Sequence, residues 1–388
     1  MPKVSGIVNM NSRFCRNGLV ERIIKAFEGI DSNLYQTNDA DSLKRAIKQI
    51  GEDNPDLGFI AAGDGGLVLT LTEYFNHYGD QKPIRMWYLP TGTHDKEARD
   101  LGIFSQLAFT GRRNQQRERF LSEVTHDLKT SRRLNMKKKD VLKISIGSED
   151  GKVETIYAFD FGAGVPAEAV MKWYGITADK ITDDTFQNSR MNYNPFGMAT
   201  VFLRNVADAL SSTEPYHRVS AQLSINSVRT MGWKKREEVH SSDNYLGIII
   251  SAGKTVLPFM KPFYLAHNQN GGAHFLASTM SDINVIKYLP RFMFGYSLKD
   301  DEQTIEREIT SVEIKFSKPE IIQFAGEFRK TAYAKVEVLN DMVEFVVPDF
   351  RGRIDYLENI AHPVLGKVAR RTLMPAYEAM FNVTNGLL

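Results

Sequence analysis

The chain has 388 residues, of which 42% are hydrophobic and 25% are charged, and its formal net charge is +2. Such a composition predicts a globular protein of about two domains, and the small net charge argues against a dedicated nucleic-acid-binding protein. Cys15 is the single cysteine, which excludes an intramolecular disulfide and suits a reducing compartment. No apolar run approaches the ~20 residues of a membrane-spanning helix, and no signal-peptide pattern opens the chain. We therefore expect a cytoplasmic protein, with peripheral contact to a membrane left open.

The first third of the chain alternates predicted strands and helices. Apolar runs predict strands at 3–9, 33–36, 57–62 and 84–89, and helical spacing predicts helices at 19–27, 41–50 and 67–78. Strands that alternate with helices predict a parallel sheet covered by helices. A polar, mostly helical segment, 112–133, follows, so we expect a nucleotide-binding α/β domain over 1–134.

From residue 135 onward the pattern changes to period-2 alternation, which is typical of strands. Such strands are predicted at 141–146, 153–161, 219–225, 246–250, 273–278, 312–316, 333–338 and 342–347, with helical inserts at 168–174 and 196–210. We expect a β-rich, sandwich-like domain over 135–350. The segment 351–388 returns to helical periodicity, and we expect it to pack back on the first domain.

The strongest local signal is the turn Gly63-Asp64-Gly65-Gly66, which follows a predicted strand and precedes a predicted helix. Glycines let a backbone approach phosphate oxygens, and a helix N-terminus offers free N–H groups and a positive dipole end. A carboxylate beside phosphates is repelled unless it binds Mg²⁺ or accepts a proton from an attacking hydroxyl, so Asp64 points to catalysis. A plain strand-to-helix turn would carry the same glycines.

Two further turns follow predicted strands of the same sheet. Thr91, Gly92 and Thr93 come after the strand at 84–89, and their hydroxyls and amides could hold a nucleotide or simply cap a helix. Asn9 and Ser12 follow the first strand, where such residues are common in ordinary loops. Ligands bind where parallel strands end, so three turns at that edge favour one shared site.

Taken together, these turns resemble the catalytic domain of the diacylglycerol kinases, a family that includes bacterial lipid kinases, sphingosine kinases and ceramide kinases. Residues 63–66 are similar to its Gly-Gly-Asp-Gly-Thr signature, and residues 90–102 to its Gly-Thr-Gly-Asn-Asp-x-Ala-Arg-x-Leu-Gly segment. Weaker similarities are found at 9–12, at 162–170 near the acceptor site, and at 326–327. The resemblance covers most of the chain in the family's order.

The resemblance implies a nucleotide-binding domain like that of phosphofructokinases and NAD kinases, a β-rich second domain, and an active site between them. It also implies that the γ-phosphate of ATP is transferred, with Mg²⁺, to a lipid hydroxyl such as that of diacylglycerol, ceramide or a sphingoid base. Three carboxylates of the family pattern are missing, because Ala325, Pro166 and Asn270 stand where aspartates are expected. These departures concern the acceptor and catalysis more than the nucleotide.

We assign roles accordingly. Asp64 would bind Mg²⁺ or act as the base, and Glu327 would act as a second catalytic residue from the β-rich domain. Asp160 is either an acceptor contact or a solvated strand end. The predicted nucleotide contacts are Asn9, Ser12, Gly63, Gly65, Gly66, Thr91, Gly92 and Thr93.

Two other functions stay open. NAD kinases and phosphofructokinases also carry a Gly-Gly-Asp-Gly turn, so the acceptor could be a soluble hydroxyl compound. The missing carboxylates also allow a nucleotide-binding protein that has lost catalysis. We expect ATP and a lipid as partners and no nucleic acid, and a homodimer is compatible with the sequence. The basic cluster beside Trp233 is either solvated surface or a contact with anionic lipid.

Overall fold

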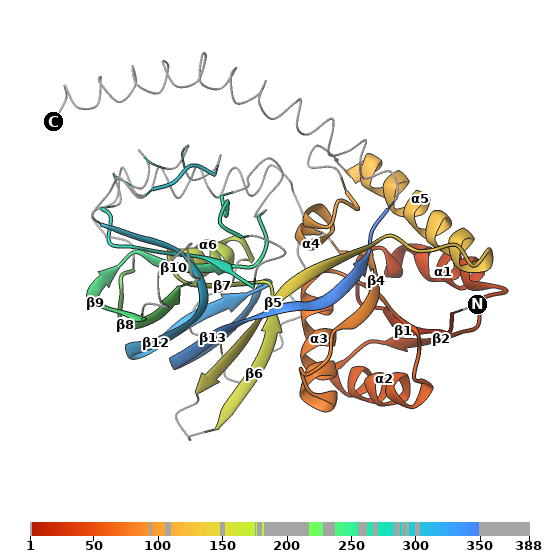
Figure 1. Cartoon of the computed structure of the whole chain (residues 1–388), viewed down its shortest axis with the longest axis horizontal. Helices are drawn as coiled ribbons and strands as arrows, with labels where there is room; N and C mark the ends of the chain where they lie inside the picture. The colour runs from red at the N-terminus through yellow and green to blue at the C-terminus, as the bar shows by residue number, and fades with distance from the viewer. Residues whose placement is uncertain are drawn as a thin grey trace, which may run out of the picture.

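The protein is described by a computed structural model (Figure 1). It describes residues 2–92, 95–104, 110–147, 152–174, 217–227, 237–254, 262–266, 271–281, 295–298 and 303–348, with single positions at 176, 181, 284, 288 and 291. The predicted helices at 196–210 and within 351–388, with the predicted packing of the latter on the first domain, lie outside these residues, as does Thr93.

The first part of the chain forms a parallel sheet covered by helices, as predicted. Its strands are β1 (Val4–Asn9), β2 (Ser32–Thr37), β3 (Leu57–Ala62) and β4 (Ile84–Pro90), in the order β4-β3-β1-β2. Its helical segments are η1 (Cys15–Leu19), α1 (Val20–Phe27), α2 (Ala40–Asp53), α3 (Asp64–Tyr78), α4 (Lys96–Asp100) and α5 (Thr110–Lys129). Helices α1 and α5 pack together on one face of the sheet, and α2 and α3 on the other (Figure 1).

Aromatic packing fixes this sheet against its helices. Trp87 on β4 is fully buried, stacks on Phe27 of α1 at 5.2 Å between ring centroids and meets Phe59 of β3 edge-on at 4.8 Å. Buried aromatic pairs of this kind add specific geometry to the hydrophobic contribution of their area. The carboxyl ends of β1, β3 and β4 are thereby held side by side, so the segments after Asn9, Ala62 and Pro90 emerge at one edge of the sheet.

The rest of the chain is rich in antiparallel strands. These elements are β5 (Met136–Gly147), β6 (Val153–Ala158), β7 (Asp160–Gly164), α6 (Val165–Tyr174), β8 (Val219–Ser227), β9 (Glu237–Tyr245), β10 (Gly247–Ser251), β11 (Ala273–Ser278), β12 (Thr304–Phe324) and β13 (Glu327–Val346). The strand predicted over 153–161 is divided at Phe159 into β6 and β7, which pair with different neighbours. The alternating pattern of the sequence does not reveal this change of partner.

The two halves share one hydrogen-bonded sheet instead of forming a separate sandwich. Strand β13 pairs antiparallel with β12 and β5 and then parallel with β4, where Val343 lies opposite Ile84. Strand β5 pairs antiparallel with β13 over this length, so the two long strands β5 and β13 connect the halves (Figure 1). The predicted boundary at residue 134 falls just before β5 and stays a prediction.

In the part of the chain that the structure describes, no helix combines the length and apolar character needed to cross a membrane.

Candidate phosphate-binding and catalytic site

The glycine turns after β3 and β4 lie against each other. Gly63 is the N-cap of α3, and Gly92 follows β4. A Cβ atom on Gly63 would lie 3.0 Å from the Cα atom of Gly92, and one on Gly92 would lie 2.5 Å from the Cα atom of Gly63. Real Cβ atoms essentially never approach backbone closer than 3.0 Å, so Gly92 requires glycine, and at Gly63 a Cβ atom would lie at the limit of what is tolerated. The main chains of the turns at Gly63 and Gly92 are therefore in direct contact, with no side chain between them, as predicted.

The helix that follows starts earlier than predicted. Helix α3 begins at Asp64 instead of Leu67, so Gly65 and Gly66 belong to its first turn. The first N–H groups of a helix have no partner within the helix, and the helix dipole makes this end attractive to anions. The side-chain amide nitrogen of Asn9 lies 3.0 Å from where a Cβ of Gly66 would be. Asn9 is thus beside the same turn, while its Oδ1 accepts a hydrogen bond from the N–H of Asn11 at 2.9 Å.

Ser12 and Thr91 join the turn that follows β1 to the turn that follows β4. The Thr91 hydroxyl donates to the Ser12 hydroxyl oxygen at 2.8 Å, and the N–H of Phe14 donates to the carbonyl oxygen of Thr91 at 3.2 Å. Both side chains are buried, with Thr91 0% and Ser12 7% exposed. Their hydroxyls are therefore engaged with each other, and we assign them to holding the turns together. The predicted contact of these hydroxyls with nucleotide stays a prediction.

Asp64 also joins two segments. Its carboxylate accepts hydrogen bonds from the N–H groups of Lys96 at 2.8 Å and Glu97 at 3.2 Å, so it caps the short helix α4. Burial and the nearby negative charges of Asp95 and Glu97 raise the pKa of Asp64 to about 7. A carboxyl with this pKa can accept a proton near neutral pH. Its geometry also gives it a structural role that the sequence did not reveal.

Asp95 is a buried charged residue, and in the sequence it stands out only as part of the motif at residues 90–102. It is 0% exposed, has a positive φ of 53°, and accepts a hydrogen bond from the N–H of Gly92 at 3.0 Å. Arg113 and Arg117 of α5 lie 3.5 and 3.7 Å from its Oδ2. Burial raises the pKa of Asp95 although these arginines oppose it. Asp95 thus fixes the Gly92 turn to α5.

Glu327 brings the β-rich part of the protein to the first glycine turn. It follows the tight turn between β12 and β13, where Ala325 and Gly326 have φ values of 48° and 85°. Its Oε1 lies 3.4 Å from where a Cβ of Gly65 would be. Burial raises the pKa of Glu327 to about 7, although Arg329 acts in the opposite direction. The two residues predicted as catalytic, Asp64 and Glu327, therefore sit on or beside the same turn of α3.

A network of ion pairs that sequence reasoning missed surrounds α4. Lys96 Nζ lies 2.7 Å from Asp160 Oδ2 and 3.1 Å from Glu97 Oε1. Glu97 also pairs with the fully buried Lys139, which lies 3.6 Å from Asp100. Burial alone would raise the pKa of Glu97, but Lys139 and Lys96 lower it below its ordinary value. Lys139 belongs to the basic run Lys137-Lys138-Lys139, and only the folded structure shows that it is buried.

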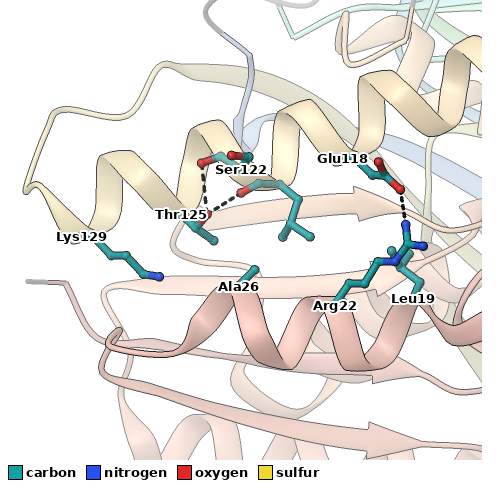
Figure 2. Close-up of a pocket in the computed structure, with 8 residues that line it drawn as sticks. Leu19, Arg22, Ala26, Glu118, Ser122, Thr125 and Lys129 are labelled. Carbon is teal, nitrogen blue, oxygen red and sulfur yellow. Dashed lines mark hydrogen bonds and ion pairs between the residues drawn. The ribbon is translucent and has the colours of Figure 1, made fainter.

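The groove between α1 and α5 is a separate feature (Figure 2). It is lined by residues that include Leu19, Ala26 and Thr125, and Arg22 reaches across it to pair with Glu118. None of the predicted site residues lines this groove. We therefore assign the glycine turns, and not this groove, as the candidate site.

Comparison with known proteins places this arrangement in a known fold. Three solved structures from Bacillus anthracis strain Sterne match with TM-scores of 0.59, 0.55 and 0.56 at 13%, 11% and 12% identity. One is named a diacylglycerol kinase, and the names of the other two add the word "putative". Each alignment covers 89% of this chain and 97% of the other. The chain has the diacylglycerol kinase fold. No protein-family model matches the sequence, and no curated protein sequence matches it.

Within this diacylglycerol kinase fold, several carboxylates near the turns already have partners inside the protein. Asp64, Asp95, Glu97 and Asp160 each accept a hydrogen bond or form an ion pair there. No group of three or more His, Cys, Asp or Glu side chains that could hold a metal is found among the described residues. Of the three departures from the family, Ala325 lies in the Glu327 turn and Pro166 lies in α6, while Asn270 is outside the described residues. Mg²⁺ is commonly held by one or two carboxylates together with substrate phosphates, so the Mg²⁺ contact of Asp64 stays a prediction.

Asp64 can be tested for both of its roles. In Asp64→Ala, two N–H groups of α4 lose their acceptor, and we expect a loss of about 1–3 kcal/mol in the free energy of unfolding. Asp64→Asn keeps one acceptor oxygen, so it should unfold closer to the wild type while losing the titrating carboxyl. Denaturant unfolding measures the first effect, and turnover of ATP measures the second. Wild-type turnover in Asp64→Asn would leave Asp64 with the capping role alone.

Proposed function

We propose that this chain is an ATP-dependent kinase that transfers the γ-phosphate to the hydroxyl group of a lipid. The observation that carries the proposal is the position of Glu327, whose carboxylate faces Gly65 in the first turn of α3. Free amides at a helix N-terminus attract phosphate, and a carboxyl with a pKa of about 7 can take a proton from an attacking hydroxyl. Phosphate binding and proton acceptance are thus located at the same turn.

The chain's own residues divide the work. The amides of Gly63, Gly65 and Gly66 hold the phosphates, and the contact between Gly63 and Gly92 keeps the main chain open to them. Glu327 accepts the proton of the hydroxyl as the oxygen attacks the γ-phosphorus and the bond to the β-phosphate oxygen breaks. Asp64 is a second candidate for this base. Mg²⁺ stays a prediction from the sequence resemblance, and the site assigns no step to it.

The lipid acceptor rests on the resemblance of the sequence motifs and on the shared fold. Diacylglycerol, ceramide and a sphingoid base each present a primary hydroxyl beside an apolar chain. A soluble hydroxyl compound would use the same phosphate-binding turn, so the acceptor has to be decided by experiment.

Purified protein with Mg²⁺ and γ-labelled ATP should label a component of a total lipid extract, which mass spectrometry then identifies. Gly65→Ala is the matched inactive control: it should label little, because its ATP binding is weakened. Its added methyl group lies in ordinary van der Waals contact and should leave the fold intact. Label found solely in water-soluble products would contradict the lipid acceptor and support a kinase of a soluble compound.

A second candidate is a nucleotide-binding protein without catalysis. This candidate is favoured because the carboxylates of Asp64, Asp95 and Asp160 all accept hydrogen bonds within the protein. ATP binding measured by calorimetry, together with no transfer to lipid or water-soluble acceptors, would support this candidate against the kinase.

A further inference from the structure

Asp160 connects the two halves of the molecule beside the candidate site. It opens β7, and its Oδ1 accepts a hydrogen bond at 2.7 Å from the N–H of Ala325 in the turn between β12 and β13. Its Oδ2 lies 2.7 Å from Nζ of Lys96 at the start of α4. One carboxylate therefore contacts both the turn that carries Glu327 and the helix that Asp64 caps.

Lys96 completes this connection. Its main-chain N–H donates to Asp64, while its side chain, 12% exposed, pairs with Asp160 and Glu97. Burial alone would lower the pKa of Lys96, but the Asp160 and Glu97 carboxylates raise it above its ordinary value. The ammonium group thus stays charged, and it links the α4 end of the first sheet to β7 of the second half.

The turn that these residues hold is under backbone strain. Ala325 has a φ of 48°, a left-handed conformation that costs a residue with a Cβ atom about 1–2 kcal/mol. Such a conformation persists where the surrounding structure restrains it. The bond from the Ala325 N–H to Asp160 is a direct restraint two residues before Glu327.

We propose that Lys96 and Asp160 are positioning residues that hold the Ala325–Glu327 turn against the first turn of α3. They set the distance between the Glu327 carboxylate and Gly65, and neither needs to touch substrate. The sequence placed Asp160 as an acceptor contact or a solvated strand end, and the structure shows it bonded on both sides. This inference rests on the proposed function for its kinetic consequence, but the geometry can be tested without turnover.

Three variants remove different parts of the connection that Asp160 makes to Lys96 and Ala325. Asp160→Ala removes both contacts, Asp160→Asn keeps an acceptor for the Ala325 N–H but removes the ion pair, and Lys96→Met removes the ion pair from the other side. Lys143→Met is the matched control, because Lys143 of β5 pairs with Asp80 at 2.6 Å between the same two halves and, among the residues that the structure describes, forms no hydrogen bond or ion pair with the glycine turns.

We expect the kcat for transfer of label from ATP to the lipid extract to fall about 10–100-fold in Asp160→Ala, since small misplacements of a catalytic group have effects of this size. It should fall less in Asp160→Asn and Lys96→Met, with KM for ATP within about threefold of wild type in all three. Hydrogen exchange of the peptide spanning 322–328 should become faster in the same order. Lys143→Met should change neither quantity.

The two readouts separate this inference from the proposed function. If the wild type transfers phosphate and Asp160→Ala keeps its kcat, the positioning role is wrong. If the wild type transfers nothing, the proposed function fails, and hydrogen exchange still decides whether the connection holds the turn. Unchanged exchange in Asp160→Ala, or an equal loss of kcat in Lys143→Met, would also overturn it, because the effect would then be general to contacts between the halves.

Discussion

Glu327→Gln should lower the rate of phosphate transfer about 10²–10⁴-fold, the range by which a general acid or base contributes to catalysis. Glutamine has nearly the same shape but cannot accept the proton. ATP binding should change little, because the amides at the start of α3 are untouched. Turnover of the wild type should rise with pH through about 7, following deprotonation of Glu327, whose pKa burial raises to that value.

The same substitution should stabilise the protein at high pH. The pKa of Glu327 rises from its ordinary 4.5 to about 7 on folding, so between these values the folded state binds more protons than the unfolded chain. The free energy of unfolding therefore falls as pH rises across this window. Glutamine stays neutral, so at pH 8 the variant should exceed the wild type by an amount on the order of 1 kcal/mol. At pH 5 the two should be nearly equal.

Denaturant unfolding at pH 5 and pH 8, with turnover measured on the same samples, checks both expectations. Glu337→Gln is the control, since it lies on the same strand with its side chain 38% exposed and paired with Lys335. Full activity in Glu327→Gln would remove Glu327 from the mechanism. Equal stability of variant and wild type at pH 8 would show that the carboxyl is not held in an unfavourable site.

Gly65→Ala should weaken ATP binding at least about tenfold without loss of stability. The new Cβ would lie 3.4 Å from Glu327 Oε1 and 3.7 Å from the carbonyl oxygen of Ala325, which are ordinary contacts. Alanine also favours a helix over glycine by up to ~1 kcal/mol. The methyl group would nevertheless occupy the space through which a phosphate oxygen reaches the amides. We expect affinity for ATP to fall at least about tenfold, since every 1.4 kcal/mol of lost binding is a factor of ten.

Gly92→Ala should behave differently, because its Cβ would lie 2.5 Å from the Cα of Gly63 and the turns would have to separate. A loss of about 1–3 kcal/mol in stability, typical of overpacking, should accompany the loss of binding. Gly147→Ala, whose Cβ would lie 3.6 Å from the Tyr333 side chain, serves as the neutral control. Calorimetric titration with ATP and thermal unfolding separate the three variants. Tight ATP binding in Gly65→Ala would place the phosphates elsewhere.

Much of the first half of the fold was predictable. The strands and helices up to Pro90 follow from short-range patterns, and the parallel order follows from their alternation. The glycine turns at Gly63 and Gly92 were also predictable, because glycine is required wherever two backbones come this close. The diacylglycerol kinase fold was inferred from the same motifs, and the structural comparison confirms it.

Local patterns could not show which distant groups become partners. Strand β13 alternates like any half-buried strand, yet it joins β4 of the first half and makes one sheet of the two. Asp64 was recognised as unusual, but its bonds to α4 depend on how the turns pack. Asp160 is separated from Ala325 by most of the β-rich region, so no spacing along the chain relates them.

The sequence by itself determined the strand-helix order, the glycine turns and the place of Asp64 in the first of them, because backbone sterics and periodicity act over a few residues. Tertiary structure alone decided that Glu327 faces Gly65, that Lys139 is internal, and that Lys96 and Asp160 connect the halves. Those relations depend on burial and on charges brought together from distant positions, and both exist only once the sheet has formed.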